Sequence, residues 1–373
     1  MCPRCSKRSR ADVVPEVNNI FMRAIRDGGS GARLIANLWG WAPYMGWTPE
    51  ETTKGIENLD KDITVLCISE MGTVERDGKE FKVGEYSLSK VGPCKETKKN
   101  LSYAKSLGHK IAAKVQINNS WEFSSVPYVP VYELVKEHIT NLTEFGVTGL
   151  MMSWTLGGYP SPSLDLVDRL LRGTLDYEDW LKERYGENWL TVKEAVHLFS
   201  EGYRYYPFDV NTLYYGAQHV GSSNLWYKER TGYDATMVCY PHDAVEQWKQ
   251  CSDEEYQDCL ENLLKNFEKG LELLDGVQGN DDFKELKAMA ETVYVNLRSE
   301  LVQFRYNKIK EGATYADVQA FIAEEKELTK RLYRLASGDA RIGYEASNHY
   351  YFTQNSFLEK FINLAALEQA FRN

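Results

Sequence analysis

The sequence predicts an α/β protein in which a (β/α)-barrel portion precedes an α-helical domain. Two observations predict this fold. Between residues 11 and 157, helical patterns and short apolar runs alternate four times. After residue 242, long amphipathic patterns follow one another, as they do in antiparallel helical domains. With 373 residues, the chain is long enough to bury a substantial core.

Each of the four repeated units pairs a helical pattern with an apolar run. The predicted helices cover residues 11–28, 48–59, 96–108 and 130–146, and the predicted strands lie within 32–41, 62–72, 109–123 and 147–162. The apolar runs do not alternate with polar residues, which indicates strands buried on both faces of a parallel sheet. Thr48 is placed to cap the second helix, with Pro49 at its first position. A polar loop is predicted between the second strand and the third helix.

Polar or aromatic residues follow the predicted strands at Trp39, Glu70, Asn118 and Trp154. Such chemistry at each strand end favours a (β/α) barrel, whose active site lies at the C-terminal ends of its strands. A barrel needs eight strands, whereas this chain has four clear units. We therefore expect the C-terminal half of a barrel, with the first half upstream or in another chain. An open four-stranded sheet is the alternative.

The patterns divide the chain into three regions. Residues 1–208 are the expected barrel portion, closed by short helices after residue 163. Residues 209–241 form an aromatic-rich connecting segment, and residues 242–373 form the expected α-helical C-terminal domain. Its predicted helices cover 252–274, 281–312, 314–338 and 357–373, and a short segment at 341–354 interrupts them.

The residues that follow the predicted strands suit the recognition of a sugar. A tryptophan face packs against the C–H groups of a sugar ring, and amide groups bind its hydroxyls. The candidates for substrate binding are Trp39, Trp41, Asn118, Asn119, Trp121, Trp154 and Tyr159. Glu70 and Glu122 directly follow apolar runs, so they are the candidate catalytic carboxylates for a glycosidic bond. The alternative for each residue is ordinary packing at the end of a strand.

Composition and motifs exclude several other classes of function. The formal charge of −10 argues against nucleic-acid and anionic-membrane partners, and no apolar run approaches the ~20 residues of a membrane span. Seven scattered cysteines and the absence of a secretory signal favour the cytoplasm. The CxxC motif of Cys2 and Cys5 lacks a second ligand pair, and His138 and His197 lie in helices as packing or surface residues. We expect no metal and no cofactor, and the sequence indicates no oligomeric state.

Four segments carry a family resemblance: "VQINNSWEFSSVPYVPV" (115–131), "SWTLGGYPSPSL" (153–164), "FSEGYRYYPF" (199–208) and "RIGYEASNHYYFT" (341–353). Together they resemble bacterial proteins related to family 20 glycoside hydrolases, the β-N-acetylhexosaminidase type. The resemblance implies a (β/α)8 barrel that hydrolyses terminal β-linked N-acetylhexosamine. It also implies attack by the substrate's own acetamido group, assisted by an aspartate–glutamate pair after strand four.

This chain departs from the family pattern because no Asp-Glu dipeptide follows a predicted strand; "SDEEY" (252–256) starts a helix. If the four units are the last four strands of a barrel, that pair would lie upstream of Met1. The resemblance then makes Trp39, Glu70, Asn118, Trp121, Glu122 and Trp154 substrate contacts. The expected function is a glycoside hydrolase, or the C-terminal part of one, acting on β-linked N-acetylhexosamine or a related oligosaccharide. The alternative is a carbohydrate-binding protein without a working general acid.

Overall fold

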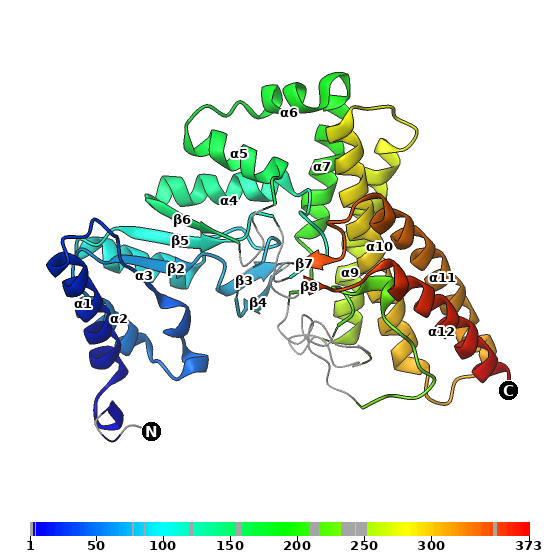
Figure 1. Cartoon of the computed structure of the whole chain (residues 1–373), viewed down its shortest axis with the longest axis horizontal. Helices are drawn as coiled ribbons and strands as arrows, with labels where there is room; N and C mark the ends of the chain where they lie inside the picture. Colours follow the sequence, from blue (N-terminus) through cyan, green and yellow to red (C-terminus); the bar gives the residue numbers. More distant parts are fainter. Residues whose placement is uncertain are drawn as a thin grey trace. The chain divides into compact units, whose positions relative to one another are not determined.

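The computed structural model describes residues 3, 5–76, 78–85, 87–118, 122–153, 159–208, 216–232, 243, 252–345 and 349–373 (Figure 1). It contains a four-stranded parallel sheet with the strand order β1-β2-β5-β6. These strands are Ile35–Asn37, Thr64–Ile68, Ile111–Val115 and Gly149–Met152. Each falls inside a run predicted as a strand, and the parallel arrangement in chain order confirms the prediction of a mixed α/β fold.

A helix precedes each strand of the sheet, as predicted. The helices are α1 (Arg10–Asp27), α2 (Pro49–Glu57), α3 (Lys95–Ser106) and α4 (Tyr132–Phe145). The Thr48 hydroxyl accepts a hydrogen bond from the Glu51 amide, and the Glu51 carboxylate accepts one from the Thr48 amide. This capping box fixes the start of α2 where the sequence predicted it.

Helices α1, α2 and α3 share one core with the sheet. That core includes Met22 from α1, Ile56 from α2 and Leu101 from α3, packed with Val65 and Cys67 of β2. All five residues of β5 are buried, and so are the last four of β2. The apolar runs of β2 and β5 therefore do mark strands buried on both faces, whereas the prediction is wrong for β1 and β6.

The two outer strands of the sheet are more exposed than the central strands. Ile35 in β1 and Met152 in β6 are 51% and 40% exposed, because among the described residues each of these strands pairs on one side only. The sheet thus has four strands in the described part of the chain. That these strands are the second half of a closed barrel stays a prediction.

The segment between β2 and α3 differs from the predicted polar loop. Strands β3 (Gly72–Arg76) and β4 (Lys79–Val83) pair in an antiparallel hairpin. Gly78, at the turn, has a φ of +75°, a conformation that glycine adopts readily. The alternation in "TVERDGKEFKV" and its Asp-Gly turn are typical of a hairpin, and its many charges hid this pattern.

The chain packs into two compact units. The sheet unit consists of Met1–Tyr86, Val91–Val115 and His138–Met152. The helical unit consists of Ser87–Lys90, Gln116–Glu137 and Ser153–Asn373. The expected regions 1–208, 209–241 and 242–373 follow sequence patterns instead of packing, and that division stays a prediction.

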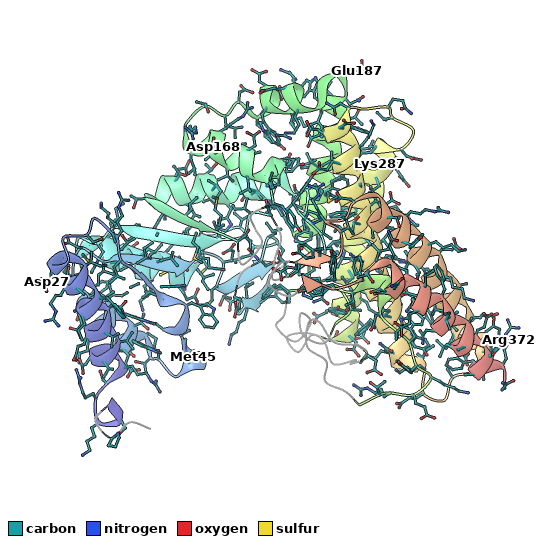
Figure 2. All side chains as sticks on the ribbon, viewed as in Figure 1. Asp27, Met45, Asp168, Glu187, Lys287 and Arg372 are labelled. Carbon is teal, nitrogen blue, oxygen red and sulfur yellow. The ribbon has the colours of Figure 1, made fainter. Side chains whose placement is uncertain are left out.

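The helical unit contains the long helices that the amphipathic patterns predicted. They are α9 (Asp253–Leu274), α10 (Asp281–Ile309), α11 (Tyr315–Gly338) and α12 (Gln354–Arg372), preceded by α5 (Pro162–Leu171), α6 (Tyr177–Tyr185) and α7 (Trp189–Tyr203). Helix α7 packs on α9, α9 on α10, α10 on α11 and α11 on α12 (Figure 1). Figure 2 shows their side chains, with Lys287 on α10 and Arg372 at the end of α12 labelled. A short hairpin, β7 (Tyr344–Glu345) and β8 (His349–Tyr350), precedes α12.

A buried ion pair joins α11 to α12. Lys360 Nζ lies 3.2 Å from Glu325 Oε1, and both side chains are fully buried. The Ser299 hydroxyl lies 3.0 Å from both Glu325 oxygens, and Lys360 also donates to the Asn224 carbonyl. The Lys360 ammonium lies 4.4 Å from the centre of the Trp226 ring. These contacts compensate for the loss of water around both charges.

None of the described helices combines the length and the apolar character that a membrane span requires.

Replacement of Lys360 by methionine should destabilise the helical unit by roughly 3–5 kcal/mol, because Glu325 would stay buried without its cation. Urea denaturation measures this change in the free energy of unfolding. The matched control is Lys326→Met, which breaks the partly exposed pair with Glu368 and should cost below about 1 kcal/mol. Equal losses in the two variants would contradict the role given to the buried pair.

Candidate active site

Two of the predicted site residues lie in the sheet unit at the ends of neighbouring strands. Trp39 is in the single turn η2 (Leu38–Gly40) that follows β1, and Glu70 is two residues beyond β2. The Asn37 side chain accepts a hydrogen bond from the Trp39 amide and so fixes the start of this turn. Trp39 is 39% exposed, whereas Glu70 is completely buried. Parallel strands therefore bring an accessible aromatic ring and a buried carboxyl group to the same edge of the sheet.

Lys114 links these residues to a second carboxyl group, that of Glu85. Lys114 is in the central strand β5, and its ammonium interacts electrostatically with both Glu70 and Glu85. Burial outweighs this attraction and lowers the pKa of Lys114 to about 8. Burial raises the pKa of Glu85, while the Trp39 indole N–H, which donates to its carboxylate, and Lys114 both oppose that rise. These interactions link the side chains of Trp39, Glu70, Glu85 and Lys114. We name these four side chains the strand-end cluster.

A histidine also lies beside Glu70. His138 Nδ1 lies 3.9 Å from Glu70 Oε1, and His138 Nε2 is hydrogen-bonded to the Ser69 hydroxyl at 2.6 Å. All three side chains are buried. A Cβ atom on Gly92 would lie 2.4 Å from Ser69 Oγ and 2.6 Å from His138 Nε2, so only glycine fits there. Ser69 and His138 are thus tightly packed, and we interpret them as residues that position Glu70.

The loop that leads into α3 reinforces this support. The Cys94 amide donates to the Ser69 carbonyl at 2.9 Å, and the Thr97 hydroxyl donates to the Ile68 carbonyl at 2.6 Å. The Asn141 side chain, from α4, donates to the Gly92 carbonyl. These bonds hold the end of β2, and with it Glu70, from two neighbouring helices.

Trp41 lies in the sheet unit, where its ring packs against Trp47 and helix α2. Its ring stacks on Trp47, with the ring centres 4.7 Å apart and the planes within 6°. A Cβ atom on Gly55 would lie 2.7 Å from the Trp41 ring, so this stack packs directly on α2. The structure does not bring Trp41 into the strand-end cluster by any described contact.

Asn118 is in the helical unit, and its side chain forms hydrogen bonds with the segment around Tyr159. Its side-chain amide donates to the Tyr159 carbonyl at 3.0 Å and accepts from the Ser161 hydroxyl at 2.5 Å. The Ser153 hydroxyl accepts bonds from the Ile117 and Asn118 amides. Ser153 has a φ of +60°, which is uncommon for a residue other than glycine and marks a constrained turn. Tyr159 is half-buried.

Glu122 is fully buried in the helical unit. Its Oε1 atom accepts a hydrogen bond of 2.5 Å from the Leu88 amide, and the Ser87 side chain is a second partner. The Tyr206 hydroxyl donates to the Glu122 carbonyl at 3.0 Å. Burial raises the pKa of Glu122 to about 8 despite the hydrogen bonds from Ser87 and Leu88. At neutral pH this side chain is therefore mostly a protonated carboxylic acid, which can donate a proton.

The remaining predicted residues, Asn119, Trp121 and Trp154, lie outside the described residues, as does Cys2 of the CxxC motif. Sequence reasoning missed three members or neighbours of the strand-end cluster: Lys114, Glu85 and His138. A lysine inside an otherwise apolar strand was the one available signal for Lys114. No sequence signal pointed to Glu85 or His138, because they come from a loop and a helix. Within the described ranges, no group of His, Cys, Asp and Glu side chains is arranged to hold a metal ion.

Comparisons with known proteins add a structural similarity. No family model matches this sequence, and no curated protein matches it. Among solved structures, the chain is similar to a GH138 enzyme targeting pectin rhamnogalacturonan II, with a TM-score of 0.48 and 10% sequence identity. The match covers 93% of this chain and 57% of that chain, so this chain spans a little over half of the enzyme's length.

The Glu122→Gln variant should remove a pH dependence from stability. The folded protein keeps the Glu122 proton up to a pKa of about 8, whereas the unfolded chain releases it near 4.5. Between these values the unfolded state binds fewer protons, so stability falls as pH rises, by up to roughly 1.4 kcal/mol per pH unit. Glutamine keeps the acceptor for Leu88 and carries no charge, so this slope should disappear. Urea denaturation from pH 5 to pH 9 measures it, and identical slopes in variant and wild type would contradict the assignment.

Proposed function

We propose that this chain is a glycoside hydrolase, or the C-terminal part of one, with its catalytic centre at the strand-end cluster. The observation that carries this proposal is that Glu70 and Glu85 both interact with the ammonium of Lys114 beside the accessible ring of Trp39. Two carboxyl groups beside a sugar-binding surface are what acid–base cleavage of a glycosidic bond requires. The position at the C-terminal edge of a parallel sheet supports it.

The two carboxyl groups suit different roles. Glu85 is partly exposed and burial raises its pKa, which favours a proton donor for the leaving oxygen. Glu70 lies with its Oε1 atom 3.9 Å from His138 Nδ1 and is attracted to the Lys114 ammonium, so its proposed role is to stabilise positive charge that develops at the anomeric carbon. Trp39 would pack against the sugar ring while its indole N–H orients Glu85.

The proposed substrate is a β-linked N-acetylhexosamine or a related oligosaccharide. This finer assignment comes from the sequence resemblance to the family 20 type. Under that assignment the predicted contacts Trp41, Asn118, Asn119, Trp121, Trp154 and Tyr159 remain candidate binding residues, and Glu122 remains a candidate proton donor because its acid is protonated at neutral pH.

A carbohydrate-binding protein without turnover is the second candidate function. The observation that favours it is the complete burial of Glu70, together with the hydrogen bonds that already occupy the Asn118 amide. Trp39 alone would then supply most of the contact with the sugar.

Glu70→Gln and Glu85→Gln should each lower kcat by about 10²-fold or more with a small change in KM, because each removes a group that acts in the transition state. The measurement is release of nitrophenol from an aryl β-N-acetylglucosaminide, with folding checked by circular dichroism. Glu80→Gln, at an exposed position of strand β4, is the matched control and should keep wild-type activity.

Calorimetric titration with N-acetylglucosamine separates the two candidate functions. Binding without turnover in the wild type would favour the carbohydrate-binding protein. Turnover that survives both glutamine variants would reject the strand-end cluster as the catalytic centre.

A further inference from the structure

The large apolar side chains that the sheet unit exposes lie at the two ends of its strand order. Among the described residues they are Val17, Ile20 and Phe21 on α1, Ile35, Trp39 and Met45 on or after β1, and Met151 and Met152 on β6. In the same part of the chain, the inner elements α2, β2, α3 and β5 expose none. Apolar surface concentrated in this way is typical of a place where another protein element packs.

Helix α1 has apolar residues on two sides. Met22 lies on one side, in the core that α1 shares with the sheet. Val17, Ile20 and Phe21 are spaced as neighbours on a second side, and Phe21 is 59% exposed. A helix with two apolar sides is suited to pack between two neighbouring elements. The second side of α1 therefore fits a further element beyond the β1 end of the sheet unit.

Strands β1 and β6 lack charged residues, which commonly protect the edge of a sheet. Charged side chains or proline at an edge hinder its free backbone groups from pairing with another strand. The residues of β1 are Ile-Ala-Asn and those of β6 are Gly-Leu-Met-Met, with no charge and no proline. In the described part of the chain each of these strands pairs on one side only. Both edges are thus suited to accept another parallel strand.

Ile35 and Met151 lie on the face of the sheet that a closed barrel would enclose. The register aligns Asn37 on β1 with Gly149 on β6, and alternation along each strand then puts Ile35 and Met151 on one face. Ala36, on the opposite face, is in the core shared with α1, α2 and α3. In a (β/α) barrel the helices cover the outside, and the other face of the strands lines the interior.

We propose that two copies of this chain pair through these edges, with β1 of each copy parallel to β6 of the other and the Val17, Ile20 and Phe21 stripe packed against the neighbouring copy. A two-fold symmetric pair forms this junction twice. Four strands from each copy give eight, the number in a (β/α) barrel, so that no edge stays unpaired. A second copy fits because each chain carries both kinds of edge.

The pairing would create one shared site from two chains. The C-terminal ends of all eight strands would surround one mouth, and each copy would contribute its own strand-end cluster to it. This consequence rests on the proposed glycosidase function, whereas the pairing itself rests on the two edges. Activity per chain should therefore fall when the protein is diluted below the Kd of the pair.

Sedimentation velocity of the full chain tests the pairing without any activity. We expect a particle of twice the chain mass of 42.9 kDa. Ile35→Lys, Met151→Glu and Phe21→Lys should each raise the Kd of the pair by about 10²-fold or more, because each buries a charge in an apolar junction. The control is Ile362→Lys, which changes a side chain on α12 that is 73% exposed and should leave the Kd unchanged.

Mixing of variants tests which edges meet. In a mixed pair of Ile35→Lys and Met151→Glu, one junction carries both substitutions and the other is wild type, so pairing should recover in part. A mixture of Ile35→Lys and Phe21→Lys damages both junctions and should not recover. Circular dichroism checks folding, and Val17→Lys replaces Ile35→Lys at the same junction if that variant does not fold.

The outcomes separate the pairing from the proposed function. A wild-type chain that stays monomeric, or a pair that Ile35→Lys and Met151→Glu leave intact, would overturn the proposal. Mixtures that recover equally would overturn the pairing of β1 with β6. If the wild type forms the pair and hydrolyses no glycoside, the proposed function fails and the shared site fails with it, while the pairing is confirmed.

Discussion

The burial of β2 and β5 on both faces is the constraint on which the candidate site depends. Strands with apolar neighbours above and below leave little room for polar chemistry along their length. Chemistry can then appear where a strand ends, as at Glu70, or where one charged residue is tolerated inside, as at Lys114. Attraction to Glu70 offsets part of the cost of burying the Lys114 ammonium.

The buried charged side chains of the two units have different surroundings. In the helical unit, Lys360 and Glu325 form a direct ion pair, and Ser299 and the Asn224 carbonyl add hydrogen bonds to it. In the sheet unit, the ammonium of Lys114 is shared between Glu70 and Glu85. A directly paired set of charges joins two helices, whereas the attraction of one ammonium to two carboxyl groups brings acidic side chains together near the end of a strand. This difference is one reason why we propose the strand-end cluster as the catalytic centre.

Support for Glu70 comes from parts of the chain that are far apart in sequence. Ser69 and His138 are separated by 69 residues and yet share a hydrogen bond of 2.6 Å. Gly92 packs against both atoms of that bond, and Asn141 holds the Gly92 carbonyl. These contacts fix the chain directly before Glu70, which suits a group that must stay aligned with a reacting bond.

The sequence by itself determined the elements of this protein and two residues of the strand-end cluster. Periodicity and capping residues located the parallel strands, the helices that precede them and the four long C-terminal helices, because burial pattern and local hydrogen bonding are properties of short segments. The same reasoning identified Trp39 and Glu70, since the end of an apolar strand is visible in the sequence. It missed the hairpin of β3 and β4, because the many charged side chains in this segment hid the alternation of residues that is typical of a strand.

Only the tertiary structure decided which side chains meet. Lys114, Glu85 and His138 come from a strand, a loop and a helix. No spacing in the chain shows that Lys114 interacts with both Glu70 and Glu85, or that His138 lies beside Glu70. The structure likewise placed Glu122 in the helical unit, with Leu88 as its partner, although the sequence had grouped it with Glu70. The physical reason is that the ionisation of a carboxyl group depends on its desolvation and on charges within a few ångströms, and distances between remote segments arise only from packing.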